Sequence, residues 1–175
     1  MARGATIYRV QLEVSLIDRG VYGERTITVA QHPSETLERT LVRILAYALR
    51  FDDRIEFGRG VSATEEPDLW VREGDGRVHE WIEVGQPDGK RLLKAARHSN
   101  HVFLFAFGDG VERWRKAQLD AATAPDNLAV ARIDDAFIGD LVAGTDRQLR
   151  WSVTLSEGVL FLTAGEKSFE TTPEI

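Results

Sequence analysis

The chain opens with regularly alternating apolar and polar residues. Every second position is apolar in this segment: Tyr8, Val10, Leu12, Val14 and Leu16. A period of two is typical of a strand with one buried face. A second alternating segment, 25–30, follows a turn at 18–20. The two segments predict an antiparallel hairpin with a loop of some length.

The clearest helical pattern follows Pro33. Apolar residues recur there at helical spacing: Leu37, Leu41, Ile44, Leu45 and Ala48. One apolar stripe of this kind predicts an amphipathic helix over about 34–51. We expect the hydroxyl of Ser34 to cap its first turn.

The middle of the chain combines short strands with a helix. The pattern predicts strands at 55–58, 68–72 and 78–84, of which the last two form a hairpin around the loop 74–76. A helix at 90–99 should begin near Asp88. The apolar run 101–107 then predicts a strand buried on both faces. Strand, helix and buried strand in this order make a right-handed crossover.

The last third alternates helices and strands again. We expect a helix at 111–121, a strand at 128–133, a helix at 135–143, a hairpin at 149–162 with its turn at Glu157-Gly158, and a loose tail at 171–175. The whole order favours a mixed α/β fold with one mixed sheet covered by helices. Since 175 residues suit one domain better than two, we expect a single domain over 1–175.

Composition excludes several kinds of chemistry. The chain has no cysteine, so thiolate zinc sites, iron–sulfur clusters and cysteine nucleophiles are excluded. No apolar run reaches the length of about 20 residues that a membrane helix needs, and we expect a cytoplasmic protein. The formal net charge of −6 is unfavourable for general binding to nucleic acid, although it leaves room for a local basic groove.

Two acidic residues should meet at the open end of the predicted hairpin. Asp68 begins one strand and Glu83 lies near the end of the other. If the loop 74–76 closes the hairpin, both carboxylates lie at the opposite end, within reach of one ion. Hard cations such as Mg²⁺ or Mn²⁺ take oxygen ligands of this kind. The alternative is a surface or structural role for both acids.

Other charged residues could complete such a site. Glu38 continues the inner row of its helix and should point inward, or it is simply a favourable charge near the helix N-terminus. Lys90, Lys94 and Arg97 form a basic row on the next helix, where a lysine could position a water molecule. The alternative is an ordinary solvated helix face.

The chain resembles the bacterial YaeQ family over essentially its whole length. The matching stretches come in order, at residues 5–8 (Ala-Thr-Ile-Tyr), 32–36 (His-Pro-Ser-Glu-Thr), 57–60 (Phe-Gly-Arg-Gly), 66–70 (Glu-Pro-Asp-Leu-Trp) and 81–88 (Trp-Ile-Glu-Val-Gly-Gln-Pro-Asp). The resemblance implies a variant of the PD-(D/E)XK nuclease fold. Its αβββαβ core would run over about 34–107, with added hairpins at both ends of the chain.

The resemblance also implies roles for individual residues. Asp68 would supply the first acid of the nuclease pattern, Glu83 the second, and Glu38 the helical acid found in many of these nucleases. The pattern has a lysine two residues after the second acid, where this chain has Gly85. Lys94, or alternatively Lys90, would then supply the ammonium.

Three functions follow as expectations. The first is a Mg²⁺- or Mn²⁺-dependent phosphodiesterase acting on nucleic acid, with Lys90, Arg91 and Arg97 contacting the polymer. The second is a module with the nuclease core that binds nucleic acid or protein without turnover. The third is a protein-interaction domain that uses an exposed edge strand of a terminal hairpin.

Overall fold

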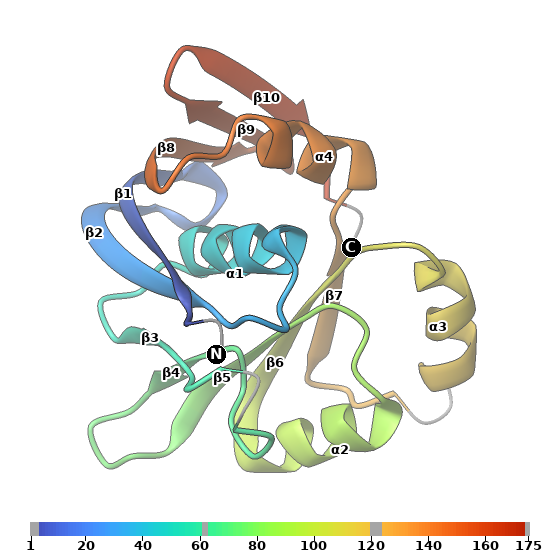
Figure 1. Cartoon of the computed structure of the whole chain (residues 1–175). Coiled ribbons are helices and arrows are strands. Elements are labelled where there is room, and N and C mark those ends of the chain that lie inside the picture. The colour runs from blue at the N-terminus through green and yellow to red at the C-terminus, as the bar shows by residue number, and fades with distance from the viewer. Residues whose placement is uncertain (1–3, 61–62, 120–123, 174–175) are drawn as a thin grey trace. The chain divides into compact units, whose positions relative to one another are not determined.

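The computed structural model describes residues 4–60, 63–119 and 124–173 (Figure 1). Its described strands form two five-stranded sheets, so the prediction of one mixed sheet was wrong. The chain divides into two compact units. The first unit comprises Met1–Asp52 and Ile133–Pro173, and the second is centred on Asp53–Arg132. The fold is mixed α/β, as the sequence indicated.

The sheet of the first unit (sheet A) has the order β10-β9-β8-β1-β2. Its strands are β1 (Thr6–Leu16), β2 (Val21–Gln31), β8 (Gln148–Ser156), β9 (Val159–Ala164) and β10 (Lys167–Thr171). β1 pairs with β2 in antiparallel and with β8 in parallel orientation. The first hairpin is confirmed, but its connection is a single short turn, Ile17–Arg19, because the alternating pattern continues through Val21.

The tail adds a strand that the sequence did not predict. β10 pairs with β9, and Thr171 lies opposite Leu160, so the expectation of a loose tail from residue 171 was wrong at that position. Residues 174–175 lie outside the described part. Polar side chains make up most of β10, and such an edge strand carries little apolar periodicity for sequence analysis to detect.

Helix α1 (Leu37–Leu49) covers the inner face of sheet A, together with α4 (Asp135–Ala143). Of its predicted apolar stripe, Leu41, Ile44, Leu45 and Ala48 are buried, while Leu37 at the start is only half-buried. The cap is Thr36, whose hydroxyl accepts the Arg39 N–H at 3.2 Å, whereas the predicted cap Ser34 lies 2.7 Å from the His32 ring. The helix therefore starts two residues later than a Ser34 cap would require.

The sheet of the second unit (sheet B) has the order β3-β4-β5-β6-β7. Its strands are β3 (Ile55–Phe57), β4 (Leu69–Arg72), β5 (Val78–Val84), β6 (Ser99–Ala106) and β7 (Leu128–Arg132). β3, β4 and β5 are antiparallel neighbours, while β5, β6 and β7 run parallel. The elements from α1 to β6 follow the order αβββαβ along the chain.

Helices α2 (Gly89–His98) and α3 (Val111–Gln118) connect the parallel strands and lie on the same side of sheet B (Figure 1). Leu92 of α2 and Val111 of α3 join one apolar cluster with Trp81 and Leu104 of the sheet. β6 is central, as expected, but His101 is exposed, so the strand is not buried on both faces throughout. No described helix is long and apolar enough to span a membrane.

A buried ion pair joins α1 to the segment before it. Arg43 donates to both carboxylate oxygens of Glu35, at 2.7 and 2.8 Å, and also to the carbonyl of Ala30. Arg39 binds the same carboxylate at 3.0 Å, from a more exposed position. Glu35 thus fixes the end of β2 against the helix.

We predict that Arg43→Met lowers the free energy of unfolding by about 3 kcal/mol, because it leaves a buried carboxylate without its main counter-charge. Arg39→Met is the matched control and should cost less than about 1 kcal/mol. Urea unfolding of the three proteins measures both values. Similar small losses in the two variants would contradict this role for Arg43.

Candidate functional site

Asp68 and Glu83 lie at the open end of the β4–β5 hairpin. Leu69 pairs with Ile82 and Trp70 with Trp81, so one further step of this register places Asp68 opposite Glu83 on the same face. Asp68 Oδ2 accepts the backbone N–H of Val84 at 2.8 Å. The predicted hairpin is confirmed, and both acids are buried.

The Glu83 carboxylate is held by two side-chain donors. Its side chain is 3% exposed, and Oε1 accepts from the indole of Trp81 at 2.7 Å and from Nε of Arg91 at 2.8 Å. Arg91 also donates to the carbonyls of Thr64 and Glu66. One guanidinium therefore links the strand, helix α2 and the preceding loop.

Arg91 was expected to contact nucleic acid, and its bond to Glu83 was not foreseen. A signal for it exists in the sequence, since Asp88 begins a helix and Arg91 falls in its first turn, just after the strand that carries Glu83. Asp88 does cap the helix, accepting the Arg91 N–H at 2.8 Å. The cap thus brings the base of the Arg91 side chain to the end of β5.

Burial, and after it the neighbouring charge of Asp68, raise the pKa of Glu83, which reaches about 7. Arg91 and the Trp81 hydrogen bond oppose this shift. Desolvation outweighs them because the carboxylate has almost no contact with water. A carboxyl whose pKa lies near neutrality can exchange a proton, or a cation in its place, at physiological pH.

The backbone explains why no lysine follows Glu83 at two residues. Gly85 has φ +102°, a conformation that side-chain-bearing residues rarely adopt. Its N–H donates to the carbonyl of Phe105 at 2.9 Å, where the chain leaves the strand. A Cβ at this position would meet no neighbouring atom, so the constraint is conformational rather than steric.

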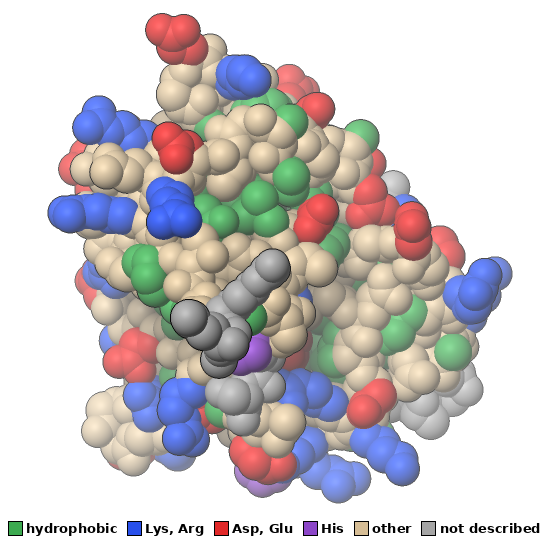
Figure 2. Space-filling model, viewed as in Figure 1, with side chains coloured by type: hydrophobic (Ala, Val, Ile, Leu, Met, Phe, Trp, Pro, Cys, Tyr) green, Lys and Arg blue, Asp and Glu red, His purple; other side chains and the backbone are tan. Residues whose placement is uncertain are grey.

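The predicted lysine has another partner. The ammonium of Lys94 binds the carboxylate of Glu65, and this contact lowers the pKa of Glu65. Lys90 and Arg97 are exposed, and neither side chain has an ion-pair partner within the described residues. Figure 2 shows Lys and Arg side chains gathered over the region of α2. Arginine, not lysine, is therefore the cation beside the acid pair.

Glu38 is exposed in the first turn of α1, so the prediction that it points inward was wrong. The helix begins only at Leu37, so Glu38 lies in its first turn. The buried acid of this region is Glu35, which sequence analysis did not single out. Glu38 belongs to the first unit, whereas Asp68 and Glu83 belong to the second.

The acid pair supplies the donors that a hard cation prefers. Mg²⁺ is commonly bound by one or two carboxylates and completes its coordination with water and phosphate oxygens. Within the described residues, no group of three or more His, Asp or Glu side chains is arranged to hold a metal ion. Asp68 and Glu83 therefore fit a cation site with two protein ligands. One of these ligands, Glu83, is already paired with Arg91.

Two five-stranded sheets with packed helices define a mixed α/β protein whose candidate site is a buried carboxylate pair at the end of a hairpin. The family described as YaeQ protein matches residues 1–173. The "Uncharacterized protein YaeQ" of Salmonella typhi is 35% identical over 172 residues, covering 97% of this chain and 94% of that protein. Its counterpart in Escherichia coli K12 is 33% identical over 171 residues, with the same coverage.

Two crystal structures are similar along the same length. The YaeQ protein from Xanthomonas axonopodis pv. citri has a TM-score of 0.91 and 41% identity, covering 97% of this chain and 96% of that one. The YaeQ protein from Pseudomonas syringae has a TM-score of 0.92 and 37% identity, covering 97% and 94%. The chain belongs to the YaeQ family, as the resemblance of its motifs indicated.

The raised pKa of Glu83 predicts a specific dependence of stability on pH. Its folded-state pKa of about 7 exceeds the ordinary 4.5, so the folded protein holds this proton more tightly between these values. Stability from this group is therefore lost as pH rises from about 4.5 to 7, by on the order of 3 kcal/mol. Glu83→Gln keeps an acceptor for Trp81 and Arg91 but has no proton to lose.

Urea unfolding at pH 5 and pH 8 measures this difference. Relative to the wild type, we expect the unfolding free energy of Glu83→Gln to rise by about 2.5 kcal/mol from pH 5 to pH 8. Glu56→Gln, a change to an exposed acid of the same sheet, should follow the wild-type profile. Parallel profiles for all three proteins would show that Glu83 titrates normally.

Proposed function

We propose that this protein is a Mg²⁺- or Mn²⁺-dependent phosphodiesterase acting on nucleic acid, built on a nuclease-like αβββαβ core over about 34–107. The observation that carries the proposal is the placement of Asp68 and Glu83 side by side on one face of the hairpin, both buried. Two carboxylates in one low-dielectric site repel each other, and a divalent cation between them removes that repulsion.

Each residue has a defined part in this proposal. Asp68 and Glu83 supply oxygen ligands, and the bound cation would lower the pKa of a water molecule and stabilise charge on the phosphate. Arg91 stays hydrogen-bonded to Glu83, Thr64 and Glu66 and would add positive charge beside the bound phosphate. Glu38 as a third ligand remains a prediction.

The basic row on α2 supports the choice of polymer. Lys90, Lys94 and Arg97 lie on the exposed side of a helix with no acidic residue in its sequence, in a chain of net charge −6. Lys and Arg neutralise backbone phosphates regardless of base sequence. The row begins beside the acid pair, since Arg91 is its neighbour in the first turn.

A second candidate, a module that binds nucleic acid without cleaving it, is favoured by one observation. Gly85 occupies the lysine position, and Lys94 is bound to Glu65, so the described residues place no lysine on the acid pair. Without an ammonium to hold the water molecule, the same surface could still bind phosphates.

Cleavage of a mixed DNA and RNA pool in Mg²⁺ or Mn²⁺ separates the two candidates. We expect Asp68→Asn and Glu83→Gln each to lower the rate by more than about 100-fold, since loss of residues that only support a metal ligand already costs 10- to 100-fold. Glu38→Gln tests the third ligand. Asp126→Asn, at an exposed acid, is the matched control and should leave the rate unchanged.

Equal rates in the wild type and both site variants would reject the nuclease. The binding of nucleic acid to the protein would then be measured. Binding without any cleavage product would support the module. For a module, we expect affinity to fall steeply with salt, and Lys90→Gln or Arg97→Gln should each reduce the slope by about one. Affinity that does not change with salt would reject nucleic acid as the partner.

A further inference from the structure

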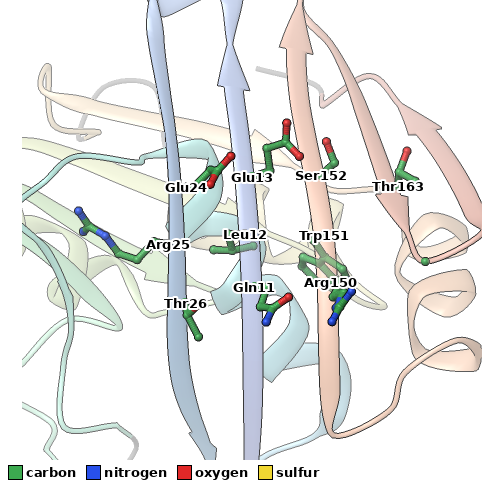
Figure 3. A pocket seen from close by; sticks show the side chains of 11 residues that line it. Gln11, Leu12, Glu13, Glu24, Arg25, Thr26, Arg150, Trp151, Ser152 and Thr163 are labelled. Carbon is green, nitrogen blue, oxygen red and sulfur yellow. The ribbon is translucent and has the colours of Figure 1, made fainter.

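The outer face of sheet A carries a wide hollow of about 740 Å³ (Figure 3). It lies over β2, β1, β8 and β9, all within the first unit, and α1 and α4 pack on the opposite face of the same sheet. The proposed phosphodiesterase site makes no use of this surface.

The strand register places the polar residues of the hollow in rows. Glu13 pairs with Glu24 across β1 and β2, Glu13 also lies beside Ser152 of β8, and Ser152 pairs with Thr163 of β9. Figure 3 shows these four side chains in one line across the sheet. Two carboxylates directly opposite each other on neighbouring strands repel, so this row is destabilising on its own.

The neighbouring row carries the opposite charge. Arg150 lies beside Gln11, two residues from Glu13 along β1, and its side chain points to the other end of the strands from the carboxylates (Figure 3). Among the described residues, none of the side chains of Glu13, Glu24 and Arg150 has an ion-pair or hydrogen-bond partner. The face therefore presents separated, unneutralised charges of both signs.

A third row adds apolar contact area. Ser15 pairs with Tyr22 and lies beside Thr154, which pairs with Phe161. Tyr22 is 64% exposed and Phe161 42% exposed, and both rank among the most exposed large apolar side chains that the structure describes. Aromatic residues in such positions are enriched where proteins bind partners.

The three rows define the ligand. A polymer with charge of one sign, such as nucleic acid, would be attracted by Arg150 and repelled by Glu13 and Glu24. The rows follow each other every two residues along the strands, about 6.8 Å apart. Side chains on one face of an extended peptide repeat at the same distance, so such a peptide can meet each row with one side chain.

We propose that the outer face of sheet A binds an extended peptide segment with the order acidic, any, basic, any, apolar. The acidic side chain lies over Arg150 and Gln11. The basic side chain lies between Glu13 and Glu24 and removes their repulsion. The apolar side chain packs against Tyr22, the exposed aromatic residue of β2 in the next row.

Nuclear magnetic resonance titration of the ¹⁵N-labelled full chain tests this site. The probes are the capped peptide acetyl-Thr-Asp-Thr-Lys-Thr-Leu-Thr-amide and its reversed sequence, since the hollow does not fix chain direction. We expect saturable shifts confined to amides near residues 11–26 and 150–163. Replacing the peptide lysine by glutamine, or its aspartate by asparagine, should weaken binding by at least about fivefold.

Variants of the protein complete the test. The double variant Glu13→Gln, Glu24→Gln should bind the original peptide about fivefold or more weaker and should bind the lysine-free peptide as the wild type does. Arg150→Gln should likewise weaken binding of the original peptide but leave binding of the aspartate-free peptide unchanged. Asp140→Asn, at an exposed acid of α4, is the control and should bind as the wild type does.

Four outcomes would overturn the proposal. The peptide could give no saturable shifts, or the uncharged peptides could bind as well as the charged one. The shifts could instead follow the free edges of β2 or β10, which would mean strand addition rather than binding to the face. Equivalent shifts from a single-stranded oligonucleotide, without any from the peptide, would also reject it.

Discussion

The buried carboxylate of Glu83 is the interaction on which the second unit depends. It lies at the end of β5, accepts hydrogen bonds from Trp81 and Arg91, and faces a second acid, Asp68. Through Arg91, the same carboxylate fixes the first turn of α2 and the carbonyls of Thr64 and Glu66. Removing the charge at this position changes both the packing of the unit and the chemistry of the buried pair that Glu83 forms with Asp68.

Two opposing effects act on the Glu83 carboxyl group. Arg91 stabilises its charged form, but burial and the charge of Asp68 outweigh Arg91 and raise the pKa to about 7. A divalent cation offers a stronger neutralisation than one guanidinium, at two carboxylates together. The left-handed backbone at Gly85 disfavours the lysine that a nuclease pattern would carry there, and Arg91 is the cation beside Glu83 instead.

Periodicity predicted the local elements well, because burial on one face leaves a direct record in the sequence. The alternation of β1, the stripe of α1 and the Asp88 cap of α2 all came from short-range patterns, and so did the meeting of Asp68 and Glu83 through a three-residue loop. Pairings between distant segments left no such record. β1 pairs with β8, which lies more than 130 residues further along the chain. Because no local pattern records this pairing, the two sheets were predicted as one. Competition between nearby polar residues was equally hidden: Thr36 rather than Ser34 caps α1, and Glu35 rather than Glu38 is the buried acid.

Glu83 is a buried carboxyl group with a raised pKa, and we propose that a divalent cation can replace its proton. The pKa of Glu83 can be measured from the carbon-13 nuclear magnetic resonance shift of its carboxyl group during a pH titration. The titration is run once without metal and once with Mg²⁺ that contains no Mn²⁺. We expect a pKa near 7 for Glu83 in the metal-free protein, against the ordinary 4.5, and a clear decrease when Mg²⁺ is added. A pKa of about 4.5 without metal, or one near 7 that Mg²⁺ leaves unchanged, would contradict it.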